Sequence, residues 1–243
     1  MSEARVPRDA QRKRLYQAEH PLPSSPLPGL DACGAFADRV VGTLWWYARF
    51  PDHRLDRIPR LRPGHGARQA FYREDDDGPT ITLPRRYRTK GVMLHELAHW
   101  AMSEDADLPN HGRTFARLLL DITLEFCGPE RADLLVQSYR EHRVSVGAVP
   151  RIGPDGRPRY GWDERLRLGK GKTLAICHHG RGGTPIATTG VYEGKDRSGK
   201  VLRVRVGAAA RPMHIPAKSV WDVRAARQPP RPAPALTTPR SRS

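Results

Sequence analysis

Cysteine is scarce in this 243-residue chain, which contains three. Cys33, Cys127 and Cys177 are far apart in sequence, and none belongs to a C-x-x-C pair. A cysteine-based zinc ribbon, or any second zinc site of that kind, is therefore not predicted. Three isolated cysteines also favour a reducing compartment over an oxidising one.

Long apolar runs are missing too. The longest, Val40 to Ala48, is too short to span the hydrocarbon core of a bilayer. The segment Met1 to Arg14 is polar and charged, without the apolar stretch of a secretory leader. The sequence thus predicts a soluble, cytoplasmic protein with no membrane partner.

Acidic residues are few in the C-terminal third. Residues 151–243 carry 20 basic and 6 acidic side chains, a net charge of +14, whereas residues 1–150 carry 22 and 20. A contact with nucleic acid, if the protein makes one, is expected in this third, with Arg203 and Arg205 as candidates. The alternative is a solvated basic tail, because 35 arginines against 7 lysines and abundant proline also result from a GC-rich genome.

The most informative segment that is present is His95-Glu96-Leu97-Ala98-His99. It has the H-E-x-x-H spacing of zinc metallopeptidases. Side chains four residues apart project from one face of a helix, so His95 and His99 can bind a single tetrahedral cation. Glu96 is rotated off that face, where it can act on a metal-bound water.

The surroundings of the motif indicate a buried helix. Residues of this helix are apolar on almost every side, which is typical of a core helix. Two imidazoles and a carboxylate on such a helix need polar partners, and a metal ion with its water would satisfy all three. The apolar residues are Val92, Met93, Leu94, Leu97, Ala98, Trp100, Ala101 and Met102.

A catalytic zinc normally has three protein ligands and one open position, so a third ligand is expected. His111 is the best candidate, because it precedes the next predicted helix and the polar segment 103–109 lets that helix fold back over the first. Glu125 and the acidic residues at 104, 105 and 107 are the alternatives. An acid in this role would place the site in the gluzincin or aspzincin class.

The predicted chemistry is hydrolysis by a metal-activated water. Zinc lowers the pKa of its bound water to about 7, and Glu96 would act as general base and return the proton to the leaving group. A further donor to the developing oxyanion is expected. Candidates for this role are Tyr72, Tyr87, Arg113 and His142, which the sequence does not rank.

The motif pair carries a resemblance. Val92 to Trp100, followed by His111-Gly112-x-x-Phe115, resembles the core of SprT-like and minigluzincin-type zincins, whose third ligand is a histidine before glycine. With Arg8-Asp9-Ala10-Gln11-Arg12-x-x-x-Tyr16-x-Ala18-Glu19, the chain is similar to an uncharacterised family of metallohydrolases from actinobacteria and their phages. The resemblance covers about residues 8–145. It implies a zincin-like fold, one zinc ion per chain and protein or peptide substrates. The chain departs from SprT-like proteins downstream, where those often carry a four-cysteine ribbon.

Hydrophobic spacing predicts the secondary structure. Helices are expected over 8–18, 31–50, the motif segment, 115–126 and 129–143, and strands over 58–62, 69–73, 80–83, 173–177, 186–192, 201–206, 213–215 and 220–223.

The predicted fold class is α+β, in five parts. Residues 1–30 form an N-terminal helix and a Pro-rich connector, and 31–145 form a zincin-like domain with a small mixed sheet and the H-E-x-x-H helix. A linker over 146–165 precedes a small, basic, barrel-like β module over 166–226. Residues 227–243 form a disordered basic tail.

The favoured function is a zinc-dependent metallopeptidase or metallohydrolase that cleaves peptide or amide bonds. Two alternatives remain open: a zinc hydrolase of a non-peptide bond, and a nucleic-acid-binding or interaction protein in which the zincin core is only a scaffold.

Overall fold

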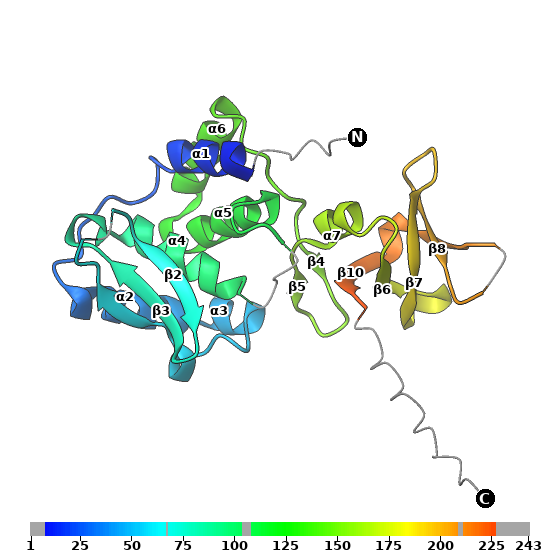
Figure 1. Cartoon of the computed structure of the whole chain (residues 1–243), viewed down its shortest axis with the longest axis horizontal. Helices are drawn as coiled ribbons and strands as arrows, with labels where there is room; N and C mark the ends of the chain where they lie inside the picture. Colours follow the sequence, from blue (N-terminus) through cyan, green and yellow to red (C-terminus); the bar gives the residue numbers. More distant parts are fainter. Residues whose placement is uncertain (1–7, 67, 104–107, 209–210, 227–243) are drawn as a thin grey trace, which may run out of the picture. The chain divides into compact units, whose positions relative to one another are not determined.

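The computed structural model describes residues 8–66, 68–103, 108–208 and 211–226, and the predicted tail over 227–243 lies outside them. The described residues form two compact units, which divide between Leu168 and Gly169. The described residues form seven α-helices and ten strands, so the predicted α+β class is confirmed (Figure 1). Among them, no helix combines the length and apolar character that a membrane span requires.

The first unit is mostly helical and holds one small mixed sheet. Strand β3 is central, pairing in parallel with β1 and antiparallel with β2. The helices are α1 (Arg8–Ala18), α2 (Leu30–Val41), α3 (Leu44–Arg49), α4 (Lys90–Ala101), α5 (Arg113–Cys127), α6 (Pro129–Glu141) and α7 (Trp162–Leu168). The strands are β1 (Arg60–Pro63), β2 (Phe71–Asp75), β3 (Gly78–Leu83), β4 (Arg151–Ile152) and β5 (Pro158–Arg159).

The single helix predicted over 31–50 is two helices. α2 ends at Val41, and the chain turns through Gly42 and Thr43 before α3 begins. The Thr43 hydroxyl accepts a hydrogen bond from the Trp46 backbone N–H at 3.2 Å, which caps the second helix. The break lets Trp46 pack into the core, where it is fully buried.

Helix α4 is the central element of this unit. Its first turn is capped by Thr89, whose hydroxyl accepts from the Val92 backbone N–H. Most of its side chains are buried, as its apolar sequence predicts. The Pro-rich connector after α1 is packed against its start: the Gly91 N–H donates to the Pro23 carbonyl at 2.8 Å, and a Cβ at Gly91 would lie 2.8 Å from the Leu22 Cβ. The connector therefore holds α1 in place.

Helix α1 lies beside α6 (Figure 1). Leu15 and Ala18, on one face of α1, are fully buried in the core. At the same helix, Gln11 exchanges two hydrogen bonds with the backbone of Ser145. An adjacent side of α1 carries Tyr16, whose ring stacks on His95 of α4, and this orientation matters for the site.

The segment predicted as a linker, 146–165, is structured. It contains the β4–β5 hairpin and the start of α7, and it belongs to the first unit. The Gly147 N–H donates to the Arg113 carbonyl at 2.6 Å, and the Tyr160 hydroxyl donates to Asp121 at 2.9 Å. These contacts join it to α5. The segment has little hydrophobic periodicity, so its sequence gave no indication of this packing.

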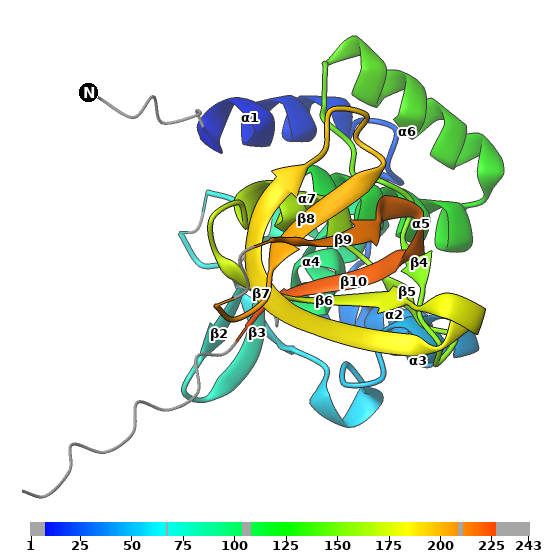
Figure 2. The same cartoon turned by 90° about the vertical axis from the view of Figure 1, so that its right-hand side faces the viewer.

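The second unit is a five-stranded antiparallel sheet in the order β10-β6-β7-β8-β9. The described pairings leave β10 and β9 as edge strands. Figure 2 shows β7 bending sharply along its length, and its register with β8 shifts between Tyr192 and Gly194. The strands are β6 (Thr173–His179), β7 (Pro185–Lys195), β8 (Val201–Arg205), β9 (Met213–Pro216) and β10 (Val220–Ala225).

Alternation along β8 shows how this small sheet forms a core. Leu202 and Val204 are fully buried, whereas Arg203 and Arg205 face solvent. Apolar residues from the other strands complete the core: Leu174, Ile176, Tyr192, Ile215, Val220 and Val223 are all buried.

Candidate metal centre

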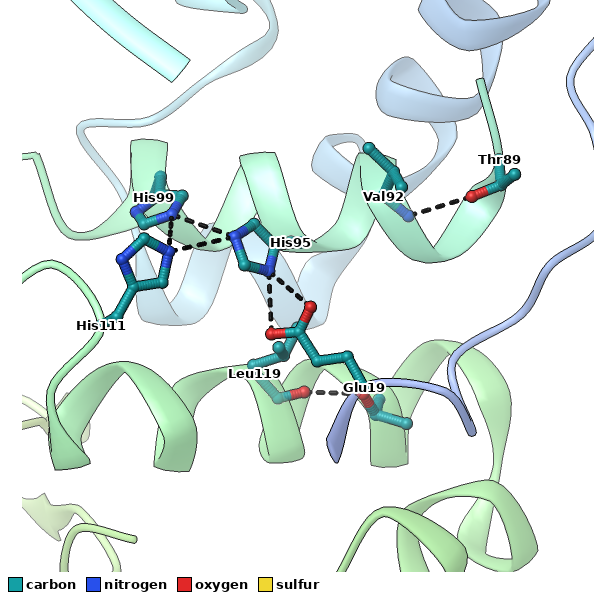
Figure 3. Close-up of polar contacts among 8 residues, drawn as sticks. Glu19, Thr89, Val92, His95, His99, His111 and Leu119 are labelled. Carbon is teal, nitrogen blue, oxygen red and sulfur yellow. Dashed lines mark hydrogen bonds and ion pairs between the residues drawn. The ribbon is translucent and has the colours of Figure 1, made fainter. Parts of the chain in front are cut away.

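Three imidazole rings converge in the first unit. The Nε2 atoms of His95 and His99 are 3.1 Å apart, those of His99 and His111 are 3.0 Å apart, and those of His95 and His111 are 3.4 Å apart (Figure 3). Zinc–nitrogen bonds of 2.0–2.1 Å at tetrahedral angles would place the nitrogens about 3.3 Å from one another. The donor atoms therefore match the size of a tetrahedral metal site, and this group could hold a metal ion.

Two of these residues are placed by helix geometry alone. His95 and His99 lie one turn apart on α4, so their rings share a face. His111 comes from the segment that precedes α5, and Gly112 is the N-cap of that helix. The third ring therefore depends on how α5 begins.

The start of α5 is held by a residue far along the chain. Gly112 has no side chain to cap the helix, and the buried Glu164 of α7 takes over this role. Its Oε2 accepts from the Thr114 backbone N–H at 3.1 Å and from the Thr114 hydroxyl at 2.6 Å. A Cβ at residue 112 would lie 3.0 Å from the Pro109 carbonyl oxygen and 3.1 Å from Glu164 Oε1, so a glycine fits closely here. Glu164 belongs to the segment 146–165 that the sequence predicts as a linker, so this segment helps to fix the position of His111.

The orientation of His95 is fixed from the other side. Both carboxylate oxygens of Glu19, just after α1, lie 3.0 Å from the His95 Nδ1 (Figure 3). Glu19 therefore accepts a hydrogen bond from the Nδ1–H of His95, which leaves a lone pair on Nε2 that points at the other two rings. A carboxylate on the outer nitrogen of a histidine ligand fixes its tautomer and raises its basicity. Sequence reasoning assigned no role to Glu19.

The environment of the rings keeps two of them unprotonated. Burial, followed by the neighbouring rings and Arg12, lowers the pKa of His99 to about 2. Burial, followed by His95 and Arg12, lowers the pKa of His111 to about 3. For His95, burial lowers the pKa, but the charge of Glu19 and the hydrogen bond to it raise the pKa, and the net direction is upward. His99 and His111 therefore offer free lone pairs at neutral pH.

Glu96 has a buried oxygen atom without a partner. Its side chain lies on α4 beside His95 and is only 3% exposed, and its Oε2 makes no hydrogen bond in the described structure. Burial raises the pKa of Glu96, while His95 and a hydrogen bond from the Tyr72 backbone lower it, and the net direction is upward. An isolated buried carboxylate oxygen is costly unless a ligand or water satisfies it.

One wall of the site is aromatic. The fully buried Phe115 ring lies 5.0 Å from His95, 4.4 Å from His99 and 5.2 Å from His111, between ring centroids. Tyr16 of α1 stacks on His95 at 5.5 Å and lies 5.1 Å from His111. The guanidinium of Arg12 lies 5.6 Å from the Tyr16 ring. Helix α1 therefore belongs to the site.

The sequence could have shown this contribution of α1. Arg12 and Tyr16 of α1 and Glu19 just after it are spaced by four and three residues, so they lie on one side, next to the face that carries the buried Leu15 and Ala18. A polar face of this kind usually meets solvent. Packing of α1 against the rest of the unit places this polar face beside the imidazoles instead.

The four residues predicted as oxyanion donors are dispersed. Tyr72 reaches the motif through its backbone, while its hydroxyl donates to Glu74 at 3.0 Å. Burial first, and then Glu74, raise the pKa of Tyr72 to about 12, although a hydrogen bond with Ser103 lowers it. Tyr87 stacks with Arg86, and Arg113 forms an ion pair with Asp163 at 3.2 Å. His142 contacts the Ser138 carbonyl at the end of α6. None of these described side-chain contacts is with the three imidazoles.

The acidic alternatives for the third ligand receive no support from the geometry. Glu125 is exposed near the C-terminal end of α5, a helix whose N-terminus follows His111. The acidic residues at 104, 105 and 107 lie outside the described residues. Within the described part of the chain, the one group of histidine, cysteine and acidic side chains that could hold a metal is His95, His99 and His111.

Comparison with known proteins gives no relative for this chain. No protein-family model, curated protein or solved structure matches it. The function is therefore argued from the site itself.

The basic candidates in the second unit are paired with an acid. An Arg203 guanidinium nitrogen lies 3.1 Å from the Glu193 Oε2 atom. The Arg205 Nε–H donates to the other oxygen of the same carboxylate, Oε1, at 2.8 Å. Both arginines are roughly half exposed. Glu193 on β7 therefore offsets part of their positive charge.

The contact between Glu19 and His95 leads to a first prediction. Glu19→Gln is expected to weaken zinc binding about 10-fold, and Glu19→Ala up to about 100-fold, because both changes remove the charge that supports His95. The measurement is competition with a zinc chelator of known affinity. Glu130→Gln, at an exposed acid of α6, is the matched control. Equal affinities for all four proteins would mean that Glu19 does not support a metal ligand.

Proposed function

We propose that this protein is a zinc-dependent metallohydrolase of the zincin type that cleaves peptide bonds. One observation carries the proposal: three imidazole nitrogens lie within 3.4 Å of one another, next to a buried Glu96 whose free oxygen has no partner. Three protein donors leave one position of a tetrahedral ion open, which is the arrangement of catalytic zinc and not of structural zinc.

Zinc is proposed because of the donor set. Imidazole nitrogens suit zinc, copper, iron and nickel, whereas magnesium and calcium prefer oxygen donors. The spacing of the nitrogens fits tetrahedral coordination, which zinc prefers. Phe115 and the apolar face of α4 surround the rings, and a dry surrounding strengthens electrostatic interactions in the site.

In the proposed mechanism, separate residues bind the metal ion, orient a ligand and transfer the proton. His95, His99 and His111 would hold the ion, and Glu19 would keep His95 in the tautomer that binds it. When bound, zinc would lower the pKa of a water ligand to about 7 and polarise the scissile carbonyl. Glu96 would take the proton of the attacking water and deliver it to the leaving nitrogen as the C–N bond breaks. The raised pKa of Glu96 suits a group that must accept a proton and release it.

The test combines metal content with activity. Protein purified without chelators or nickel resin should contain about one zinc per chain and should cleave an unfolded protein such as denatured casein. Removal of the metal with a chelator should abolish cleavage, and stoichiometric zinc should restore it. A protein that binds one zinc and cleaves a non-peptide bond instead would retain the metal centre but refute the substrate class. A protein that binds no zinc would refute the whole proposal.

A second proposal concerns the basic unit. Residues 169–226 carry 11 basic and 3 acidic side chains, and two of the arginines share an exposed face of β8. This charge supports contact with nucleic acid, and such contact could bring a hydrolase to substrates bound there. It would also be compatible with a protein that binds nucleic acid without catalysis.

The pairing of Arg203 and Arg205 gives this proposal a specific test. Glu193→Gln in the full chain is expected to increase affinity for duplex DNA several-fold and to steepen its salt dependence, because two arginines lose their internal counter-charge. Fluorescence anisotropy at several salt concentrations measures both. Asp196→Asn, at an acid in a nearby turn, is the control. No binding by any of these proteins at low salt would refute nucleic-acid contact.

A further inference from the structure

Helix α1 and Glu19 just after it present polar side chains to the three imidazoles, and the proposed mechanism uses only Glu19. Tyr16 and Arg12 lie one and two turns before Glu19 on the same face. Tyr16 contacts two of the three rings, and Arg12 lies over Tyr16. A cation and a phenol beside a proposed metal centre are the groups that would bind an anion.

The exposure of the surrounding rings shows where a substrate can enter. Phe115 contacts all three imidazoles and is fully buried, so it closes one side of the group. Tyr16 contacts only His95 and His111 and is 42% exposed. It therefore lies on a solvent-exposed side of the imidazole group, within reach of a substrate.

The hydroxyl of Tyr16 is available for a substrate. The Arg12 guanidinium lies 5.6 Å from the centre of its ring. Burial, the largest effect, raises the pKa of the hydroxyl, whereas the charge of Arg12 and a hydrogen bond from it lower the pKa. A guanidinium only donates hydrogen bonds, so it occupies an acceptor position of the hydroxyl and leaves the O–H proton free to donate. Packing on His95 restricts the ring, which reduces the entropy lost when the hydroxyl binds a ligand.

We propose that the Tyr16 hydroxyl donates a hydrogen bond to the oxyanion that forms during peptide hydrolysis, and that Arg12 holds and polarises this hydroxyl. The proposal rests on the proposed function. As the water oxygen bonds to the carbonyl carbon, the carbonyl π electrons move to its oxygen, and Tyr16 stabilises the resulting negative charge. When the C–N bond breaks and Glu96 protonates the nitrogen, the carbonyl re-forms and the charge at Tyr16 disappears.

The experiment uses Tyr16→Phe in the full chain, which keeps the ring on His95 and removes only the hydroxyl. With zinc bound, kcat is expected to fall about 10²–10³-fold, the loss typical of one oxyanion donor, with KM changed only a few-fold. Zinc content should stay the same. Tyr47→Phe, at an exposed tyrosine of α3, is the control and should leave kcat unchanged.

A second measurement does not depend on hydrolysis. Methylphosphonate, a tetrahedral anion, is titrated into cobalt-substituted protein, and the visible spectrum of the cobalt reports binding. Affinity should fall at least 10-fold in Tyr16→Phe and also in Arg12→Met, but not in Tyr47→Phe. If no peptide is cleaved by the unaltered protein, the proposed substrate fails, yet this titration still tests the anion-binding role.

Two results would overturn the inference. Unchanged kcat together with unchanged methylphosphonate affinity in Tyr16→Phe would show that Tyr16 serves only to pack against His95. If Tyr16→Phe were to lose metal, the methylphosphonate affinity of Arg12→Met would provide the test. Arg12 is exposed, so its replacement leaves the packing of Tyr16 on the imidazoles unchanged. Full affinity of Arg12→Met for methylphosphonate would then refute the proposal.

Discussion

Glu96→Gln is expected to lower the rate of peptide hydrolysis by about 10²–10⁴-fold, the contribution typical of a positioned general base. Glutamine has almost the same size and shape as glutamate, but its amide cannot accept the proton of the attacking water. The bound zinc should remain at about one per chain, because the three imidazoles and Glu19 are untouched. The measurement pairs initial rates with zinc content on the same preparation.

The stability of this variant is part of the prediction. Burial raises the pKa of Glu96, which means that the protein disfavours the charged form at this position. A neutral amide of equal size should therefore leave the melting temperature unchanged or raise it. Glu141→Gln, at an exposed acid of α6, should change neither the rate nor the melting temperature. Hydrolysis at the unaltered rate by Glu96→Gln would remove Glu96 from the mechanism.

His111→Ala has the second large expected effect. It removes one of three ligands, so the zinc affinity should fall by more than the roughly 10–100-fold that loss of an outer carboxylate costs. Zinc stabilises the folded protein in proportion to the logarithm of its concentration over the dissociation constant. The zinc-dependent rise in melting temperature should therefore shrink strongly, and hydrolysis should be lost with it.

The control for this variant is His65→Ala, which removes an exposed histidine from a turn. It should bind zinc as the unaltered chain does, and it excludes a general effect of losing a histidine. Calorimetric titration with zinc measures both affinities directly. Equal affinity in His111→Ala would assign the third ligand to an acid instead, and the segment 104–107 would be the first place to test.

Sequence reasoning located much of the site because its rules are local. The four-residue spacing of His95 and His99 places both rings on one helical face in any α-helix, whatever surrounds it. The position of His111 before a second amphipathic helix predicts it as the third ligand, and the structure brings its ring to the other two. The strand pattern of the second unit, with Leu202 and Val204 inward and Arg203 and Arg205 outward, is also a local property.

The same reasoning missed residues whose role depends on distant partners. Glu19 is 76 positions from His95, and Glu164 is 50 positions from Thr114. The sequence predicts a linker over 146–165, yet the Gly147 N–H donates to the Arg113 carbonyl at the start of α5, so the segment has a structural role. Local spacing contains no information about which elements meet across such distances.

By itself, the sequence determined that two imidazoles and a carboxylate share one buried helix and that strands follow in a basic C-terminal part. Only the tertiary structure decided that α1 brings Arg12, Tyr16 and Glu19 to those imidazoles, and that Glu164 caps the helix that follows His111. The physical reason is that the helical repeat fixes neighbours within a turn or two, whereas contacts between separate elements form only where burial of apolar surface packs those elements together.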